Sequence, residues 1–172
     1  MSDESWPDEI FDVLRQQQVR QVAYVPDAGH KRLIERCGDD PAMRCVPLTT
    51  EEEGVALLCG AWFAGERGVL LMQSSGLGNC INMFSLTRNC RTPLLMLVTM
   101  RGEYGEFNPW QAPMGQNSEE LLKLSGAYVF RFDEPARAGE IVEAAARMAF
   151  EGPAMTAALI GQRVIGAKTF GR

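Results

Sequence analysis

Three consecutive glutamates, Glu51, Glu52 and Glu53, stand at the expected start of a strongly apolar helix and are the first candidates for proton chemistry in this sequence. One interpretation is structural, because acidic residues in a first turn complement the helix dipole and Thr50 can act as the N-cap. The other interpretation is functional. A carboxylate in an apolar, water-poor site can hold a proton and exchange it with a ligand nitrogen. Composition alone leaves both interpretations open.

A second candidate is the run Gln-Ser-Ser-Gly-Leu-Gly-Asn at 73–79, in which small residues separate an apolar strand from a helix. Backbone N–H groups in such a run can face an anion or a flat ring. The run fits neither familiar nucleotide motif, because Ile81 stands where the dinucleotide fingerprint has its third glycine and no Gly-Lys-Ser/Thr follows. A tight structural turn is the alternative interpretation.

Two further side chains follow expected strand ends. His30, the one histidine, can act as an acid, a base or an anion contact near neutral pH, with a surface histidine as the alternative. The guanidinium of Arg101 would suit a carboxylate, sulfonate or phosphonate, with a surface ion pair as the alternative. Residues 104–115 are too apolar for an ordinary solvent loop, so their aromatic side chains predict a lid or a partner interface.

The cysteines show no Cys-x-x-Cys spacing, and together with a single histidine they give no zinc ligand set. We therefore expect five small, reduced cysteines in the core. Cys80, at the expected start of a helix, could be a nucleophile activated by the helix dipole, but no base is suitably placed for that chemistry.

The elements that must position these residues alternate regularly between strands and helices. We expect strands at 21–25, 43–48, 69–73, 94–100, 128–132 and 154–160, and helices at 6–17, 30–37, 51–65, 78–89, 118–124 and 135–150. Runs such as 69–72 and 94–98 are apolar without alternation, as in parallel sheets covered on both faces. The sequence therefore predicts a three-layer α/β/α domain with a mainly parallel sheet of about six strands. Ligands of such sheets bind beyond the carboxyl ends of the strands.

Length and charge narrow the class of protein. With 172 residues the chain is close to the ~150-residue length of one domain, so residues 1–172 are expected to form a single domain. The net charge of −5 argues against affinity for nucleic acid or anionic membranes through bulk electrostatics. An acidic N-terminus and the lack of a long apolar run predict a cytoplasmic protein without membrane insertion. The tail after Gln162 looks loosely organised.

Four blocks, taken together and in order, closely resemble the pyrimidine-binding (alpha) subunits of sulfopyruvate decarboxylases, with phosphonopyruvate decarboxylases as the nearest relatives. The resemblance extends from about Ile10 to Ile160. The blocks are Thr-Glu-Glu-Glu-Gly at 50–54, Met-Gln-Ser-Ser-Gly-Leu-Gly-Asn at 72–79, Arg-Gly-Glu at 101–103 and Gln-Ala-Pro-Met-Gly-Gln at 111–116.

This resemblance implies an enzyme that uses thiamine diphosphate and Mg²⁺ to decarboxylate a small 2-oxo acid. In such enzymes one α/β domain binds the aminopyrimidine ring and a second holds the diphosphate through Mg²⁺. The second domain is marked by Gly-Asp-Gly, whereas the only Gly-Asp here, Gly38-Asp39, lacks the second glycine. A separate diphosphate-binding beta subunit carrying Gly-Asp-Gly is therefore implied, in an α₂β₂ or larger assembly, and the isolated chain is expected to be inactive.

The resemblance also implies roles for individual residues. Glu51, nine residues before Gly60, would protonate the aminopyrimidine ring nitrogen and so activate the cofactor, with Glu52 in this role if the register slips by one. Cofactor-binding positions are Glu51, Gln73, Ser74, Ser75, Gly76 and Asn79, and substrate-binding positions are Ala28, His30, Arg101 and Gln111.

This sequence departs from the commoner sulfopyruvate pattern at several positions. Thr50 stands where Arg is frequent, Ser74 where Asn is frequent and His30 in place of an apolar residue, and the segment after Arg101 gains aromatic side chains. These changes suggest a 2-oxo acid less strongly anionic than sulfopyruvate, carrying an aromatic or apolar group. The competing hypothesis is a non-catalytic α/β module that binds a small anion or a nucleotide for regulation.

Overall fold

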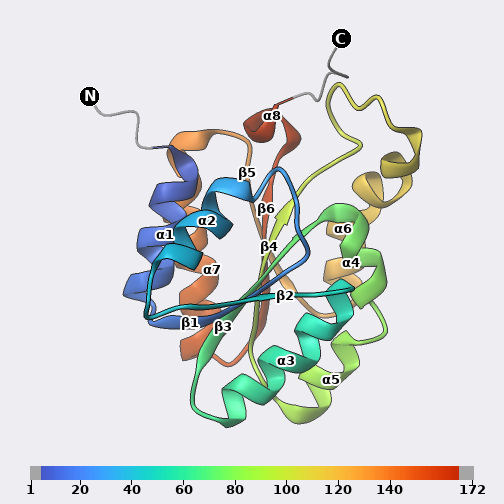
Figure 1. The fold of residues 1–172 in the computed structure, drawn as a ribbon. Helices are drawn as coiled ribbons and strands as arrows, with labels where there is room; N and C mark the ends of the chain where they lie inside the picture. The colour runs from blue at the N-terminus through green and yellow to red at the C-terminus, as the bar shows by residue number, and fades with distance from the viewer. Residues whose placement is uncertain (1–4, 167–172) are drawn as a thin grey trace.

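A six-stranded sheet forms the middle layer of the protein (Figure 1). The computed structural model describes residues 5–166, to which every structural statement below refers. The strand order is β2-β1-β3-β4-β6-β5, and every pairing of neighbours is parallel. The strands are β1 Val19–Tyr24, β2 Arg44–Pro47, β3 Arg67–Gln73, β4 Leu94–Thr99, β5 Tyr128–Phe132 and β6 Met155–Ile160.

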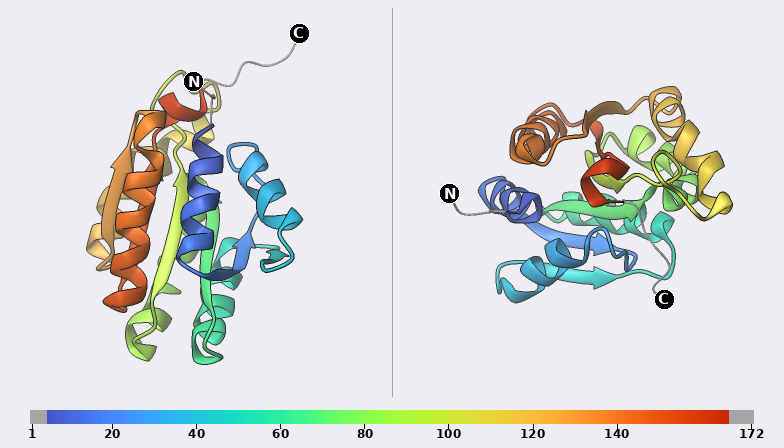
Figure 2. Two further views of the ribbon diagram at one scale, coloured as in Figure 1. Left: turned by 90° about the vertical axis from the view of Figure 1, so that its left-hand side faces the viewer. Right: turned by 90° about the horizontal axis from the view of Figure 1, so that it is seen from above.

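Helices cover both faces of this sheet. The helices α1, α2 and α7 pack on one face, and Figure 2 shows α1 and α7 side by side there, while α3, α4, α5 and α6 pack on the other. The α-helices are α1 Trp6–Gln16, α2 Lys31–Asp39, α3 Glu51–Phe63, α4 Ser74–Cys80, α5 Phe84–Cys90, α6 Ala112–Leu124, α7 Ala138–Glu151 and α8 Gln162–Ile165, and the short 3₁₀ helices are η1 Pro109–Gln111 and η2 Pro135–Arg137. The predicted three-layer α/β/α fold is confirmed.

The unbroken apolar character of the central strands follows from this layering. Every residue of β4 and of β6 is buried. Along β4, Leu95 and Leu97 pack in the cluster beneath α1 and α7, whereas Met96 and Val98 pack in the cluster beneath α3 and α6. Because both faces are covered, alternate side chains enter different cores and both must be apolar.

The predicted boundaries around the chemically interesting runs are wrong in two places. The helix expected at 78–89 is divided into α4 and α5, and α4 already begins at Ser74, so most of the expected loop is helical. Here packing outweighs the low helix propensity of glycine, since Gly78 lies against Met114 of α6. The helix expected at 118–124 begins earlier, at Ala112, and η1 precedes it, because Pro109 and Pro113 occupy first turns and the Asn108 side chain caps η1.

The tail was also predicted incorrectly in part. Residues 163–166 are not loosely organised, because α8 continues to Ile165 and Gln162 is buried. Residues 167–172 lie outside the described part of the chain. Within residues 5–166, no helix has the length and apolar character that crossing a bilayer requires.

Candidate active site

The carboxyl ends of the strands bring the predicted residues to one edge of the sheet, where the three glutamates have different environments. Glu51, the first residue of α3, is only 7% exposed, whereas Glu52 and Glu53 are exposed. The Glu53 carboxylate accepts a hydrogen bond of 2.9 Å from the backbone N–H of Thr49. Thr50 is the N-cap residue, but its side chain makes no capping hydrogen bond. Glu53 therefore stabilises the start of α3 through its hydrogen bond with the Thr49 backbone, whereas Glu51 makes no such contact in the described chain.

Glu51 is held against α4 by two features of the 73–79 run. A β-carbon on Gly76 would lie 2.2 Å from Glu51 Cδ, so only glycine leaves room for this carboxyl group. Asn79 Nδ2 donates a hydrogen bond of 2.9 Å to Glu51 Oε2. None of the hydrogen bonds within residues 5–166 reaches the other oxygen, Oε1. The structure therefore brings Glu51, Gly76 and Asn79 together around one carboxylate that keeps an oxygen for a ligand.

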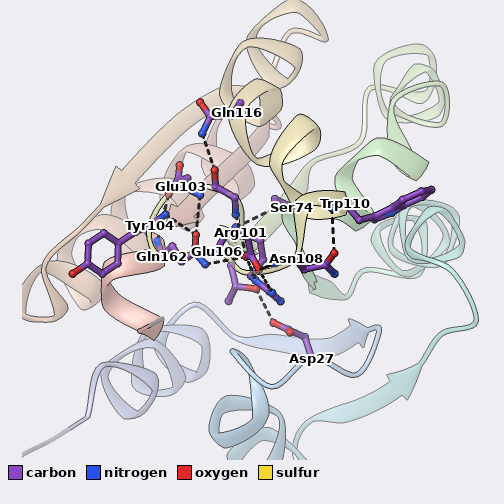
Figure 3. A network of polar contacts seen from close by, with 12 residues as sticks. Asp27, Ser74, Arg101, Glu103, Tyr104, Glu106, Asn108, Trp110, Gln116 and Gln162 are labelled. Atoms are coloured by element: carbon purple, nitrogen blue, oxygen red, sulfur yellow. Dashed lines mark hydrogen bonds and ion pairs between the residues drawn. The ribbon is translucent and has the colours of Figure 1, made fainter. Parts of the chain in front are cut away.

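A second group joins the ends of β3 and β4 (Figure 3). Ser74 Oγ accepts a hydrogen bond of 3.1 Å from the Arg101 backbone N–H, so this hydroxyl braces the two strand ends. The Arg101 guanidinium forms a two-pronged ion pair with Glu106, Nε to Oε2 at 2.7 Å and Nη2 to Oε1 at 2.8 Å. Both side chains are buried, so this is not the surface ion pair considered as the alternative.

Electrostatics explain why that pair is permanently charged. Hydrogen bonds from Arg101, and further ones from the backbone of Asn108 and Gly102, lower the pKa of Glu106 to about 2. The carboxylate is therefore ionised at any working pH and neutralises the Arg101 guanidinium. In this structure the cation predicted to meet an anionic substrate is already paired within its own chain.

His30 lies inside the protein. Its ring is fully buried, and Nε2 lies 3.2 Å from the Met72 carbonyl oxygen and 3.1 Å from that of Leu97. Because both neighbours are acceptors, Nε2 must carry a proton. Burial lowers the pKa of His30, so the ring is neutral with Nδ1 as its acceptor. The alternative of a surface histidine is wrong, and the ring pins the start of α2 to β3 and β4.

Two amide side chains offer acceptors that the described residues leave without a partner. The carbonyl oxygens of Gln73 and Gln111 are buried without a hydrogen bond. Buried acceptors of this kind are rare in folded proteins and are normally satisfied by water or a ligand. An aminopyrimidine ring carries an amino group that donates such bonds and a ring nitrogen that a protonated carboxyl can meet. Together with Glu51 over Gly76, these atoms fit the group that the sequence implied.

The remaining predicted positions are more open. Ser75 is half-buried, and Ala28 is exposed. Ala28 lines two clefts of about 430 Å³ and about 520 Å³, which share Lys31 and Glu35. Glu51 lines neither cleft. The described part of this chain also has no group of three or more His, Cys, Asp or Glu side chains arranged to hold a metal ion.

The cysteine hypothesis loses support in the structure. Cys80 is fully buried, and burial raises the pKa of its thiol to about 12. A nucleophilic cysteine needs a thiolate, which this environment disfavours.

Three polar residues of this edge were not identified from the sequence. Glu106 pairs with Arg101, Gln162 reaches the same loop from α8, and Asp27 Oδ2 accepts a hydrogen bond of 2.7 Å from Thr99 Oγ1. An acidic residue shortly after Arg101 was a usable signal for the first contact. No local pattern pointed to Gln162, because its partners lie some 60 residues earlier in the chain.

Comparison with known proteins adds to this geometry. Residues 7–119 match the family described as the N-terminal TPP binding domain of thiamine pyrophosphate enzymes. The chain is 33% identical over 140 residues to sulfopyruvate decarboxylase subunit alpha of Methanococcus maripaludis, covering 81% of this chain and 84% of that one. It is 32% identical over 135 residues to the same subunit of Methanocaldococcus jannaschii, covering 78% and 80%.

Longer relatives and a solved structure complete the picture. Phosphonopyruvate decarboxylase of Streptomyces viridochromogenes is 40% identical over 108 residues, which are 62% of this chain but 27% of that one. The fold is similar to that of the 2-oxoglutarate:ferredoxin oxidoreductase from Magnetococcus marinus, with a TM-score of 0.72 over 94% of this chain and 29% of that one. Sequence identity there is 12%, so this likeness concerns the fold alone.

Proposed function

The chain belongs to the family of N-terminal TPP binding domains of thiamine pyrophosphate enzymes, and from that premise we propose that it is the pyrimidine-binding subunit of a thiamine diphosphate-dependent 2-oxo acid decarboxylase. Its relatives named subunit alpha imply a partner subunit. Other relatives are decarboxylases of which this chain covers only 27% or 30%. We assign the remaining function to a diphosphate-binding beta subunit that carries Gly-Asp-Gly and holds Mg²⁺, in an α₂β₂ or larger assembly, with residues 1–172 as one domain.

The observation that carries this proposal is the buried Glu51 carboxylate against Gly76. Thiamine diphosphate, when bound, supplies the electron-accepting ring that lets a 2-oxo acid lose carbon dioxide. The part of this chain is to hold a proton at Glu51 Oε1 for the aminopyrimidine ring nitrogen. Asn79 holds Oε2 through its hydrogen bond, so Oε1 is the oxygen that would be left to meet the ring nitrogen.

Neighbouring residues complete the binding surface. The free carbonyl oxygens of Gln73 and Gln111 are suited to accept hydrogen bonds from an amino group or from the substrate side. Ser74 acts on the binding surface indirectly, because its hydroxyl accepts a hydrogen bond from the Arg101 backbone N–H. Ser75 and Ala28 remain proposed contacts of cofactor and substrate. For Arg101 and His30 the contacts within the chain favour roles in shaping the site.

The experiment that tests the proposal begins with copurification of the natural partner with this chain. The complex is titrated with thiamine diphosphate and Mg²⁺, and carbon dioxide release is measured over a panel of 2-oxo acids that includes sulfopyruvate, phosphonopyruvate and aromatic members. We expect decarboxylation, with turnover of at least one less anionic acid. Turnover of sulfopyruvate alone would contradict the expectation about the side chain.

Matched variants assign the glutamate. Glu51→Gln is expected to lower carbon dioxide release at least ~100-fold, as loss of a proton-transfer group does. Glu52→Gln, one residue along and exposed, is the control and should retain activity within about 3-fold. Equal loss in both variants, or none in Glu51→Gln, would remove Glu51 from the mechanism. A complex that binds no cofactor would favour the regulatory binding module.

A further inference from the structure

The loop at 101–111 is fastened by a residue from the far end of the chain. Gln162, the first residue of α8, is 1% exposed. Its Oε1 accepts hydrogen bonds of 2.8 Å from both the Glu103 and the Tyr104 backbone N–H groups. Its Nε2 donates one of 3.0 Å to Glu106 Oε2. One amide side chain thus binds the loop at Glu103, Tyr104 and Glu106 (Figure 3).

Glu106 is the centre of this arrangement. Its carboxylate accepts five N–H donors, two from the Arg101 guanidinium, one from Gln162 and two from the backbone of Gly102 and Asn108. So many charge-assisted bonds to one buried carboxylate leave the loop little freedom. Burial of the aromatic side chains does not order the loop, since Tyr104 is 46% exposed and Trp110 is 82% exposed.

Close backbone packing couples the position of this loop to that of Gln111. Gly102 adopts a φ of 76°, and a β-carbon there would lie 2.7 Å from the Gln111 carbonyl oxygen. At Gly115, a β-carbon would lie 1.7 Å from the Arg101 carbonyl oxygen. The start of α6 is therefore in direct contact with the two residues that Glu106 holds. A shift of Gly102 must move Gln111.

We propose that Gln162 and Glu106 are positioning residues that hold the loop at 101–111 in its working arrangement before substrate arrives, and so place the buried Gln111 side chain at the substrate side. The inference rests on the proposed function, in which Gln111 contacts substrate. A loop ordered during folding does not lose conformational entropy when substrate binds, so its contacts contribute more fully to affinity. Loss of the clamp therefore weakens substrate binding more than the chemical step.

Amide hydrogen exchange tests the clamp in the full chain alone. In Gln162→Leu, the Glu103 and Tyr104 amides lose their acceptor, and we expect their exchange to accelerate at least ~10-fold while core amides of β4 change little. Gln162→Asn, shorter by one methylene, serves if the first variant folds poorly. Arg163→Gln is the matched control. Arg163 is the next residue of α8, and its Cζ lies 4.6 Å from the centroid of the Tyr104 ring, so this variant alters a contact with the same loop but leaves the hydrogen bonds of Gln162 in place. Unchanged exchange in both Gln162 variants would overturn the proposal.

Kinetics of the reconstituted complex test the role in positioning. We expect Gln162→Leu and Gln162→Asn to raise KM for the 2-oxo acid ~10-fold or more with kcat within about 3-fold, and Arg163→Gln to leave both unchanged. Faster exchange without a change in KM would make the clamp merely structural and overturn its role. If the wild-type complex releases no carbon dioxide, the proposed function fails, and the exchange measurements then decide alone whether the clamp orders the loop.

Discussion

Glu51 and Gly76 are in such close contact that one methyl group decides where the carboxylate can lie. In Gly76→Ala the new β-carbon would meet Glu51 Cδ at 2.2 Å, so the carboxylate must move. We expect carbon dioxide release by the complex to fall at least ~100-fold, as for a displaced catalytic group. The control is Gly60→Ala on the exposed side of α3, where nothing lies within 4 Å. That variant should keep its activity and gain up to ~1 kcal/mol of stability, and similar activity in the two variants would argue against a role for Glu51.

His30 makes a second prediction at this scale, about acid stability. Burial lowers its pKa in the folded protein below the ordinary value of 6.5, so the unfolded chain binds the proton more readily. The contribution to stability is therefore present above pH 6.5 and is lost as the pH falls below it. We expect the free energy of unfolding, measured with urea at pH 7 and pH 5, to fall less in His30→Gln than in the wild type. Equal pH dependence in both proteins would contradict this account.

Individual site residues differ in how far the sequence could identify them. The resemblance pointed to Glu51 but allowed Glu52. In the folded protein only Glu51 is buried against Gly76, which supports its proposed role and could not be read from the sequence. Arg101 was recognised as important, but its partner Glu106 was not. Gln162 could not be found at all, since its hydrogen bonds join residues that only the finished sheet brings together.

The loop after β4 depends on the buried ion pair between Arg101 and Glu106. In Arg101→Gln the carboxylate stays buried without its cation, and we expect a loss of ~3–5 kcal/mol in unfolding free energy. The control Arg137→Gln breaks an exposed pair with Glu140 and should cost at most ~1 kcal/mol. A similar small loss for both variants, measured by urea denaturation, would contradict a tightly held loop.

The stability of the protein in acid tests the contribution of Glu106 to its pair with Arg101. Hydrogen bonds from Arg101, together with those from the backbone of Asn108 and Gly102, lower the pKa of Glu106 from 4.5 to about 2. Its stabilisation is therefore present above pH 4.5 and disappears as the pH falls towards 2. The same free energies of unfolding, followed from pH 5 downwards, should fall more steeply in the wild type than in Arg101→Gln.

Among the elements, strands were easier to predict than the short helices. A short apolar run such as 94–98, closely bounded by turns, is typical of a buried strand. The strand expected at 94–100 is β4, Leu94–Thr99, so its predicted end differs by one residue. The Ser-Gly-Leu-Gly-Asn run has the composition of a loop, yet α4 forms because Gly78 and Gly76 let α6 and Glu51 approach. Local propensity predicted the opposite, and only packing against other elements decides such a case.

At the scale of the whole molecule, the position of Glu51 predicts how the isolated chain behaves. Glu51 is only 7% exposed and lines neither of the two clefts at Ala28, so neither cleft gives a ligand access to its carboxylate. Binding sites for ligands of this size normally enclose most of the ligand. We expect calorimetric titration of the isolated chain with thiamine diphosphate and Mg²⁺ to give no saturable binding below ~1 mM, and the complex with its partner to bind at least ~100-fold more tightly. Micromolar binding by the isolated chain would refute the divided site.

The place of β5 at the sheet edge has a consequence for how the chain is made. In the part of the sequence that the structure describes, the strand neighbour of β5 is β6, which is synthesised later, and not β4. When β5 leaves the ribosome, its partner strand has not yet been synthesised, so β5 can pair only after β6 has been completed at Ile160. Gln162 comes immediately afterwards, so the loop that it holds is among the last parts to become ordered. A nascent chain stalled before β6 would have a paired sheet of four strands, and its loop at 101–111 would lack the hydrogen bonds from Gln162.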